Sequence, residues 1–210
     1  MLLSVSGPGT RAGWWPFQVG LGLFGGALLV GLAAAGAAII GLAFARVRAG
    51  KVSVLAVALV LGGACAAVPP GYIHSLKTLP YINDITTDTE RPPQFSPPKP
   101  YESHFPELQQ IGYPDLRPLE LPLPPKQAFA RALETVRAQG WQITALDESA
   151  GVIQAVAVTR WFGFKDDVAI RVTPAGAGSR VDMRSKSRVG RSDAGANARR
   201  IREFLAAVSG

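Results

Sequence analysis

Adjacent carboxylates at Asp166 and Asp167 are the residues whose type and spacing best suit chemistry in this sequence. They follow the aromatic run 161–164 and Lys165. Carboxylates in a turn could bind a cation or act as general acid and base. In a strand, successive side chains point to opposite faces, and the two groups could not act together. The pattern favours a plainer interpretation, in which an aromatic strand end precedes a polar turn.

Further polar residues near the C-terminus extend this candidate cluster. Ser192 and Asp193 precede a predicted helix, where a side-chain oxygen caps free amide groups. Arg200 lies in the first turns of that helix, where the helix dipole does not stabilise a cation. We therefore expect Arg200 to pair with a carboxylate, with Asp166, Asp167 and Asp193 as the alternatives. The full candidate cluster is Trp161, Asp166, Asp167, Asp193 and Arg200.

A basic row on the predicted strand 179–189 is the candidate partner surface. With the two-residue period of a strand, its charged residues share the face opposite Val181 and Met183. The row is either a solvated sheet face or a platform for anionic envelope material, such as lipid head groups or cell-wall polymer. The row consists of Arg180, Arg184, Lys186 and Arg188 on this strand, together with Arg171, which is expected to share the face from the neighbouring strand.

A third interpretation is that an acidic segment covers the basic row. Between Pro69 and Pro125 the chain has seven acidic residues and four basic ones. A segment of that sign would complement a basic domain surface, although each exposed ion pair contributes only about 0–1 kcal/mol.

Motifs of common enzyme classes are absent from the sequence. His74 and His104 are the only histidines, and neither has metal-ligand spacing. Cys65 is the only cysteine, which excludes a disulfide within the chain. A phosphate-binding glycine loop and a nucleophile elbow are also missing. We expect no metal and no cofactor, and favour a binding or structural module over an enzyme. The alternative is a hydrolase-like periplasmic enzyme that uses Asp166 and Asp167.

Two apolar runs predict a membrane protein. The first covers 17–45 and the second 52–68, with a basic segment between them. A span needs about 20 apolar residues, so the second run is near the lower limit of about 17. Pro69-Pro70 is expected to end the second helix. Whether Cys65 is modified, or the second span cleaved, stays open.

The orientation follows from the positively charged residues between the runs. Lys and Arg collect in cytoplasmic loops, so the connecting segment is expected in the cytoplasm. It carries Arg46, Arg48 and Lys51. This places the protein in a bacterial inner membrane, with both spans crossing it and the C-terminal domain in the periplasm. Glycines such as the Gly22/Gly26 pair favour packing of the two spans on each other over a dimer seam.

The chain beyond the membrane predicts an arm followed by an α+β domain. Residues 71–125, the arm, are rich in proline but also in apolar residues, so we expect an extended segment that docks on the domain. The boundaries are a short tail at 1–16, a transmembrane hairpin at 17–70, the arm at 71–125 and the domain at 126–210. The domain is a four-stranded antiparallel sheet covered on one face by two helices. Its strands are expected at 141–146, 152–164, 168–172 and 179–189, and its helices at 125–139 and 194–208.

Three stretches, at 82–90, 159–168 and 184–193, resemble the domain of unknown function family 1499. The resemblance extends from about Tyr81 to the C-terminus. It implies that arm and domain form one unit, often preceded by membrane spans, and it implies no activity, cofactor or catalytic residue. The expected partners are the lipid bilayer and an anionic envelope component or another membrane protein. Nucleic acid is not expected despite the net charge of +7, because the predicted compartment excludes it.

Overall fold

The computed structural model describes residues 2–44 and 52–210. Arg46, Arg48 and Lys51, on which the predicted orientation depends, lie outside the described residues. Contacts divide the chain into two compact units. The first is Met1–Lys77 with Arg160–Gly163, and the second is Thr78–Thr159 with Phe164–Gly210.

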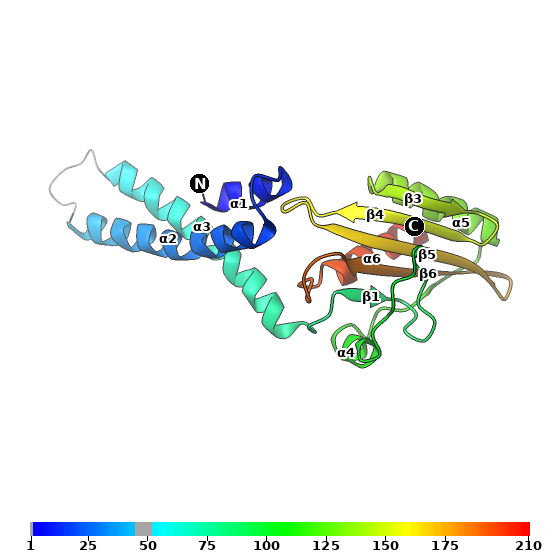
Figure 1. Cartoon of the computed structure of the whole chain (residues 1–210). Helices are drawn as coiled ribbons and strands as arrows, with labels where there is room; N and C mark the ends of the chain where they lie inside the picture. The colour runs from blue at the N-terminus through cyan, green and yellow to red at the C-terminus, as the bar shows by residue number, and fades with distance from the viewer. Residues whose placement is uncertain (1, 45–51) are drawn as a thin grey trace. The chain divides into compact units, whose positions relative to one another are not determined.

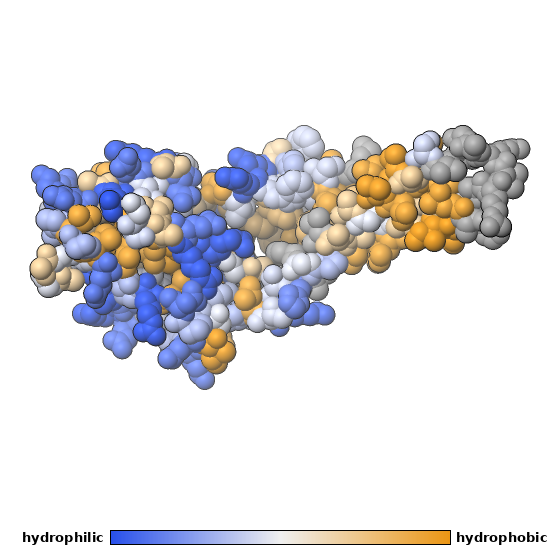
Figure 2. All heavy atoms as spheres, turned by 180° about the vertical axis from the view of Figure 1, so that it is seen from behind, coloured by the Kyte–Doolittle hydropathy of each residue, from blue (hydrophilic) through white to orange (hydrophobic). Residues whose placement is uncertain are grey.

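The first unit is helical. Its helices are α1 (Leu2–Arg11), α2 (Phe17–Phe44) and α3 (Val52–Thr78). Within the described ranges one helix, Phe17–Leu42, is long and apolar enough to cross a membrane. Figure 2 shows apolar side chains gathered over this part of the chain. The predicted tail at 1–16 contains α1, which the sequence analysis did not anticipate.

The second predicted span differs from expectation in length and in its end. The apolar part of α3 is Ser53–Ala67, which is shorter than the stretch a span needs. The helix also continues through Pro69-Pro70 to Thr78, so the prediction that the prolines end it is wrong. A proline removes one donor at a cost of about 3 kcal/mol, which a long helix can absorb when its neighbouring turns remain bonded.

Helices α2 and α3 approach each other at glycines. A Cβ on Gly31 would lie 2.6 Å from the Gly62 oxygen, and a Cβ on Gly62 would lie 2.9 Å from the Gly31 oxygen. By contrast, a Cβ on Gly22 or Gly26 would meet no described atom within 4 Å. The close contact within the chain is therefore made by glycines outside the Gly22/Gly26 motif.

The second unit is built on an antiparallel sheet, as predicted, but the sheet has six strands rather than four. The two additional strands, β1 (Asp84–Thr86) and β2 (Leu119–Leu121), come from the arm. The others are β3 (Gln142–Asp147), β4 (Val152–Val158), β5 (Lys165–Ala175) and β6 (Gly178–Ser187). The order is β1-β6-β5-β4-β3, and β2 also pairs with β6.

Strands β1 and β2 lie end to end along the outer edge of β6. Ile85 is opposite Ser185, and Glu120 is opposite Arg180. Each strand has three residues and is flanked by proline-rich chain, so neither shows the alternation that identifies a strand. The arm is therefore part of the sheet, and its first residues, 71–78, belong to α3.

The core lies between the sheet and two helices that cover one face of it (Figure 1). These are α5 (Pro125–Ala138) and α6 (Ala196–Ser209), close to the predicted ranges. They bury Phe129 and Phe204 against strand residues such as Ile170. The arm contributes to the same core, including residues of its own helix α4 (Phe105–Gly112). Buried arm residues are Ile82, Ile85, Phe105, Tyr113, Leu116 and Leu121.

We predict that Gly31→Leu separates α2 from α3, because its side chain would overlap the α3 backbone. Overpacking of this kind costs about 1–3 kcal/mol. Thermal unfolding of the full chain in detergent, followed by helical circular dichroism, should show a lower midpoint. Gly26→Leu is the matched control and should leave the midpoint unchanged. Equal loss in both variants would instead indicate that the Gly22/Gly26 face packs against a second copy.

Candidate functional site

Arg184 occupies the centre of the sheet face that the arm covers, and its side chain is 0% exposed. Its Nε donates to Asp84 Oδ1 at 2.9 Å, and its Nη2 donates to Asp84 Oδ2 at 2.8 Å. Nη2 also donates to the Lys99 carbonyl at 3.0 Å. The guanidinium lies 4.7 Å from the Phe95 ring centroid and 5.3 Å from that of Tyr101. A bidentate carboxylate and two aromatic faces thus replace the water that a buried arginine loses.

Asp84 holds a second cation of the basic row. The register of β1 on β6 places Asp84 opposite Lys186, whose Nζ lies 2.8 Å from Asp84 Oδ2. Asp84 is itself 0% exposed. A carboxylate so deeply buried is stabilised only if its charge is compensated, and the pairs with Arg184 and Lys186 provide this.

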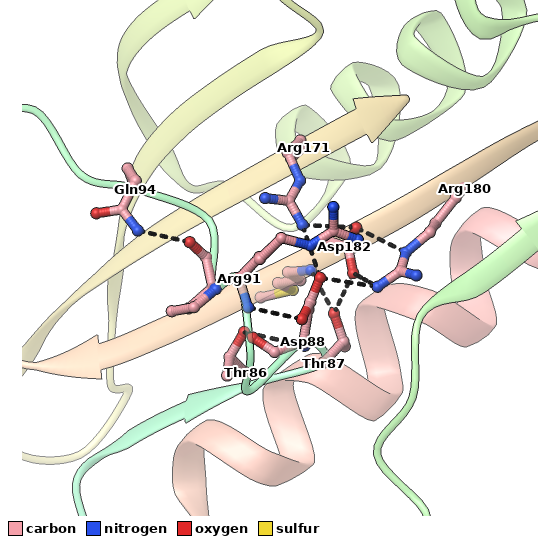
Figure 3. A network of polar contacts seen from close by, with 10 residues as sticks. Thr86, Thr87, Asp88, Arg91, Gln94, Arg171, Arg180 and Asp182 are labelled. Carbon is pink, nitrogen blue, oxygen red and sulfur yellow. Dashed lines mark hydrogen bonds and ion pairs between the residues drawn. The ribbon is translucent and has the colours of Figure 1, made fainter. Parts of the chain in front are cut away.

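Two arginines and two aspartates form a further network beside the first (Figure 3). Arg171 Nη2 lies 3.1 Å from Asp88 Oδ2 and 3.0 Å from Asp182 Oδ2. Arg180 contacts the same two carboxylates, at 2.9 Å through Nη2 and 3.0 Å through Nε. Thr87 joins the network, because its hydroxyl donates to Asp182 Oδ1 at 3.2 Å. Each carboxylate is therefore shared by both guanidinium groups.

These networks show that the basic row is paired with carboxylates of the arm. Asp84 and Asp88 both come from the acidic arm, and they lie on the face that the row occupies. Arg184 is closed off from solvent, while Arg171 and Arg180 keep about a third or less of their side chains exposed. The segments 82–90 and 184–193, which carry the family resemblance, therefore contact each other and hold the arm on the sheet.

Asp166 and Asp167 lie in β5 and point to opposite faces of the sheet. Asp166 Oδ2 accepts from Arg200 Nη2 at 2.5 Å, on the side of α6. Asp167 accepts from Arg188 Nη2 at 2.7 Å and also pairs with Lys99, on the side of the arm. Acid–base catalysis by the two together needs both at one reacting group, and this geometry separates them.

The remaining members of the predicted cluster have other roles. Asp193 caps α6, since its oxygens accept from the amides of Gly195 at 2.9 Å and Asn197 at 2.7 Å. Burial raises the pKa of Asp193 above its ordinary value, although these two hydrogen bonds offset part of the effect. Trp161 belongs to the stretch Arg160–Gly163, which groups with the first unit. Of the three carboxylates considered for Arg200, Asp166 is its partner.

A pocket of about 210 Å³ opens where the arm crosses the sheet. Lys99, Asp167 and Arg188 lie on its wall together with Gln154. Burial raises the pKa of Asp167, but hydrogen bonds from Arg188 and Lys99 lower it more strongly, so that this pKa lies below its ordinary value. We refer to this cavity as the Lys99 pocket. Its lining residues are Phe95, Ser96, Pro97, Lys99, Thr144, Gln154, Ala155, Asp167, Val168 and Arg188.

Sequence reasoning identified Asp167 and Arg188 of this pocket but missed Lys99 and Gln154. Lys99 lies among prolines, 68 residues from the carboxylate that it contacts, and no local pattern indicates that pairing. Gln154 lies inside an otherwise apolar strand. In the part of the chain that the structure describes, no group of three or more histidine, cysteine or acidic side chains is placed to hold a metal ion.

Comparisons with known proteins agree with the sequence resemblance. The family model described as "Protein of unknown function (DUF1499)" matches residues 84–208, from β1 into α6. No curated protein matches the chain. Among solved structures, the crystal structure of Ara h 8.0201 is 12% identical and has a TM-score of 0.25. That likeness covers 44% of this chain and 91% of the other, and it is too low to carry an argument about fold or function.

We predict that Asp84→Ala strongly destabilises the sheet, because it leaves Arg184 buried without a counter-ion. The loss should be about 3–5 kcal/mol. Amide hydrogen exchange of β6, measured on the full chain in detergent, should accelerate accordingly. Asp115→Ala is the matched control: Asp115 pairs with Arg202 at 2.6 Å, but both side chains are about half exposed. That variant should lose less than about 1 kcal/mol, and equal losses would contradict the role given to Asp84.

Proposed function

We propose that this chain, which belongs to the DUF1499 family of proteins of unknown function, is a membrane-tethered cell-envelope protein whose folded domain binds an anionic envelope component. The apolar helix α2 supports the tether. We further propose that α3 is a second, shorter span, since a bilayer adapts to a short apolar stretch at modest cost. The membrane is then a bacterial inner membrane, and the domain lies in the periplasm.

The charge balance on the arm-covered face is the observation that carries the binding proposal. Six basic side chains on this face contact four carboxylates, so positive charge remains in excess after every pair is made. The basic residues are Lys99, Arg171, Arg180, Arg184, Lys186 and Arg188, and the acidic ones are Asp84, Asp88, Asp167 and Asp182. An excess of one sign concentrates partners of the other sign, such as lipid head groups or cell-wall polymer.

A binding role suits this geometry better than hydrolysis. The carboxylates that the sequence offered for catalysis, Asp166 and Asp167, are each held by a guanidinium group on separate faces. Their pairing fixes the sheet, the arm and α6 to one another. We therefore assign these residues to the framework of a binding module.

Reporter fusions test the proposed compartment. Alkaline phosphatase joined after Gly210 should be active, because it folds only after export, and green fluorescent protein at the same position should be dark. The same reporters inserted after Arg48 should give the opposite pattern, because that segment is expected in the cytoplasm. A fluorescent fusion at Gly210 would overturn the periplasmic assignment.

In-cell photocrosslinking tests the binding role. A photoreactive amino acid at Thr144, which is exposed and lines the Lys99 pocket, should capture an anionic lipid or polymer identifiable by mass. The control position is Glu134, which is exposed on α5 and therefore belongs to the helical layer. Capture of the same material from both positions, or of none from Thr144, would contradict the proposal.

A further inference from the structure

We propose that the Lys99 pocket is a phosphate-binding site, which takes either free phosphate or the phosphate of a small ester such as a lipid head group. This inference rests on the proposed function and specifies its site. One wall is the arm segment 95–99, and the floor is formed by β3, β4 and β5. The volume of about 210 Å³ is below the roughly 300–1,000 Å³ of pockets for drug-sized ligands. The pocket therefore suits one charged group with a small substituent.

Donors outnumber acceptors on the polar wall of the pocket. Arg188 uses Nε and Nη2 on Asp167, and its Nη1 makes no hydrogen bond within the described residues. The Arg188 side chain is 43% exposed, so this free edge can reach a ligand. Lys99 has three N–H donors and one carboxylate partner, Asp167. The available donors call for a ligand rich in acceptor oxygens.

Gln154 adds a neutral donor to this wall. Its side-chain oxygen accepts from the Ser96 amide at 2.9 Å, which fixes the amide group against the arm. The residue is only 8% exposed and lines the pocket, and its amide nitrogen makes no hydrogen bond to any described residue. The only buried polar side-chain atom without a partner in the described residues is the Tyr113 hydroxyl, so the Gln154 nitrogen is reached by solvent and can donate to a ligand that enters the pocket.

The charges on the pocket wall favour an anionic ligand. Asp167 is the single carboxylate among the lining residues and faces two cations, Lys99 and Arg188, so the wall keeps a net positive charge. A metal ion such as Ca²⁺ would need several oxygen ligands, which this wall does not provide. Asp167 holds the two cations in place when the pocket is empty, and it competes with an anion that enters.

Phosphate suits this arrangement because its oxygens point in several directions. Lysine binds phosphate as a compact point charge, and arginine binds it through directed N–H groups. Here the two cations converge from different elements, Lys99 from the arm and Arg188 from the chain that follows β6. A tetrahedral anion can contact both at once and accept from Gln154 as well.

Calorimetric titration of the full chain in non-ionic detergent tests the site, with inorganic phosphate and glycerol 3-phosphate as probes at constant ionic strength. Arg188→Gln and Lys99→Gln should each weaken binding about tenfold or more, since a charged hydrogen bond contributes about 1.5–3 kcal/mol. Asp167→Asn should tighten binding, because it removes the competing carboxylate. Arg137→Gln is the control: Arg137 is exposed at the end of α5, and the same change of charge there should have no effect.

Nanodiscs distinguish the two sources of phosphate. If the ligand is a lipid head group, the full chain in phosphatidylglycerol nanodiscs should bind added phosphate more weakly than in nanodiscs of a phosphate-free glycolipid. Equal affinity would assign the site to free phosphate or a soluble ester.

Thermal unfolding of each variant shows that it is folded. If Asp167→Asn does not fold, the variants of the half-exposed Arg188 and of Lys99 decide the question. Absence of phosphate binding at millimolar concentration, or binding unchanged by Arg188→Gln, would overturn the site. Capture from Thr144 in cells would then still support the broader function, so the two proposals can fail separately.

Discussion

The buried ion pair between Arg184 and Asp84 is the constraint on which the rest of the domain depends. Neither side chain has any exposed surface, and an unpaired charge at such a depth costs several kcal/mol even after relaxation. The pair joins residues 100 positions apart in the chain. Either charge can be buried only if the arm and β6 lie side by side. Strand β1, the network around Asp88 and the wall of the Lys99 pocket all depend on this packing of the arm along β6.

Strand β6 has alternating apolar and charged residues although neither of its faces is fully open to solvent. Its apolar residues, such as Val181 and Met183, face α5 and α6, and its charged residues face the arm. Alternation usually marks a strand with one wet face. Here both faces are covered, and Arg184 on the polar face is dry because an arm carboxylate replaces the water, while Arg180 and Lys186 stay partly exposed. A charged face can therefore be interior when a segment of opposite sign lies on it.

The sequence predicted those parts of the fold that rest on local patterns. Helices α5 and α6 and strands β3 to β6 have clear periodicity in the sequence. Arg200 was expected to pair with a carboxylate because its position in the first turns of α6 opposes the helix dipole, and this prediction is confirmed. Strands β1 and β2 were missed because three residues between prolines carry no period. Lys99 was missed for a related reason, since its partner is brought near only by the path of the arm. The turn expected at Asp166 and Asp167 is instead the start of β5, because pairing with β6 extends the strand in both directions.

The attachment of β1 and β2 to the last strand of the sheet has a consequence for biosynthesis. Translation proceeds from the N-terminus, so Asp84 is made 100 residues before Arg184. Translation adds roughly 5–20 residues per second, so about 5–20 s separate the synthesis of Asp84 from that of Arg184. During this interval the arm carboxylates are solvated by water. Contacts between such distant residues also form slowly. The sheet therefore cannot be completed until β6 has been synthesised, because β1 and β2 have no other strand to pair with.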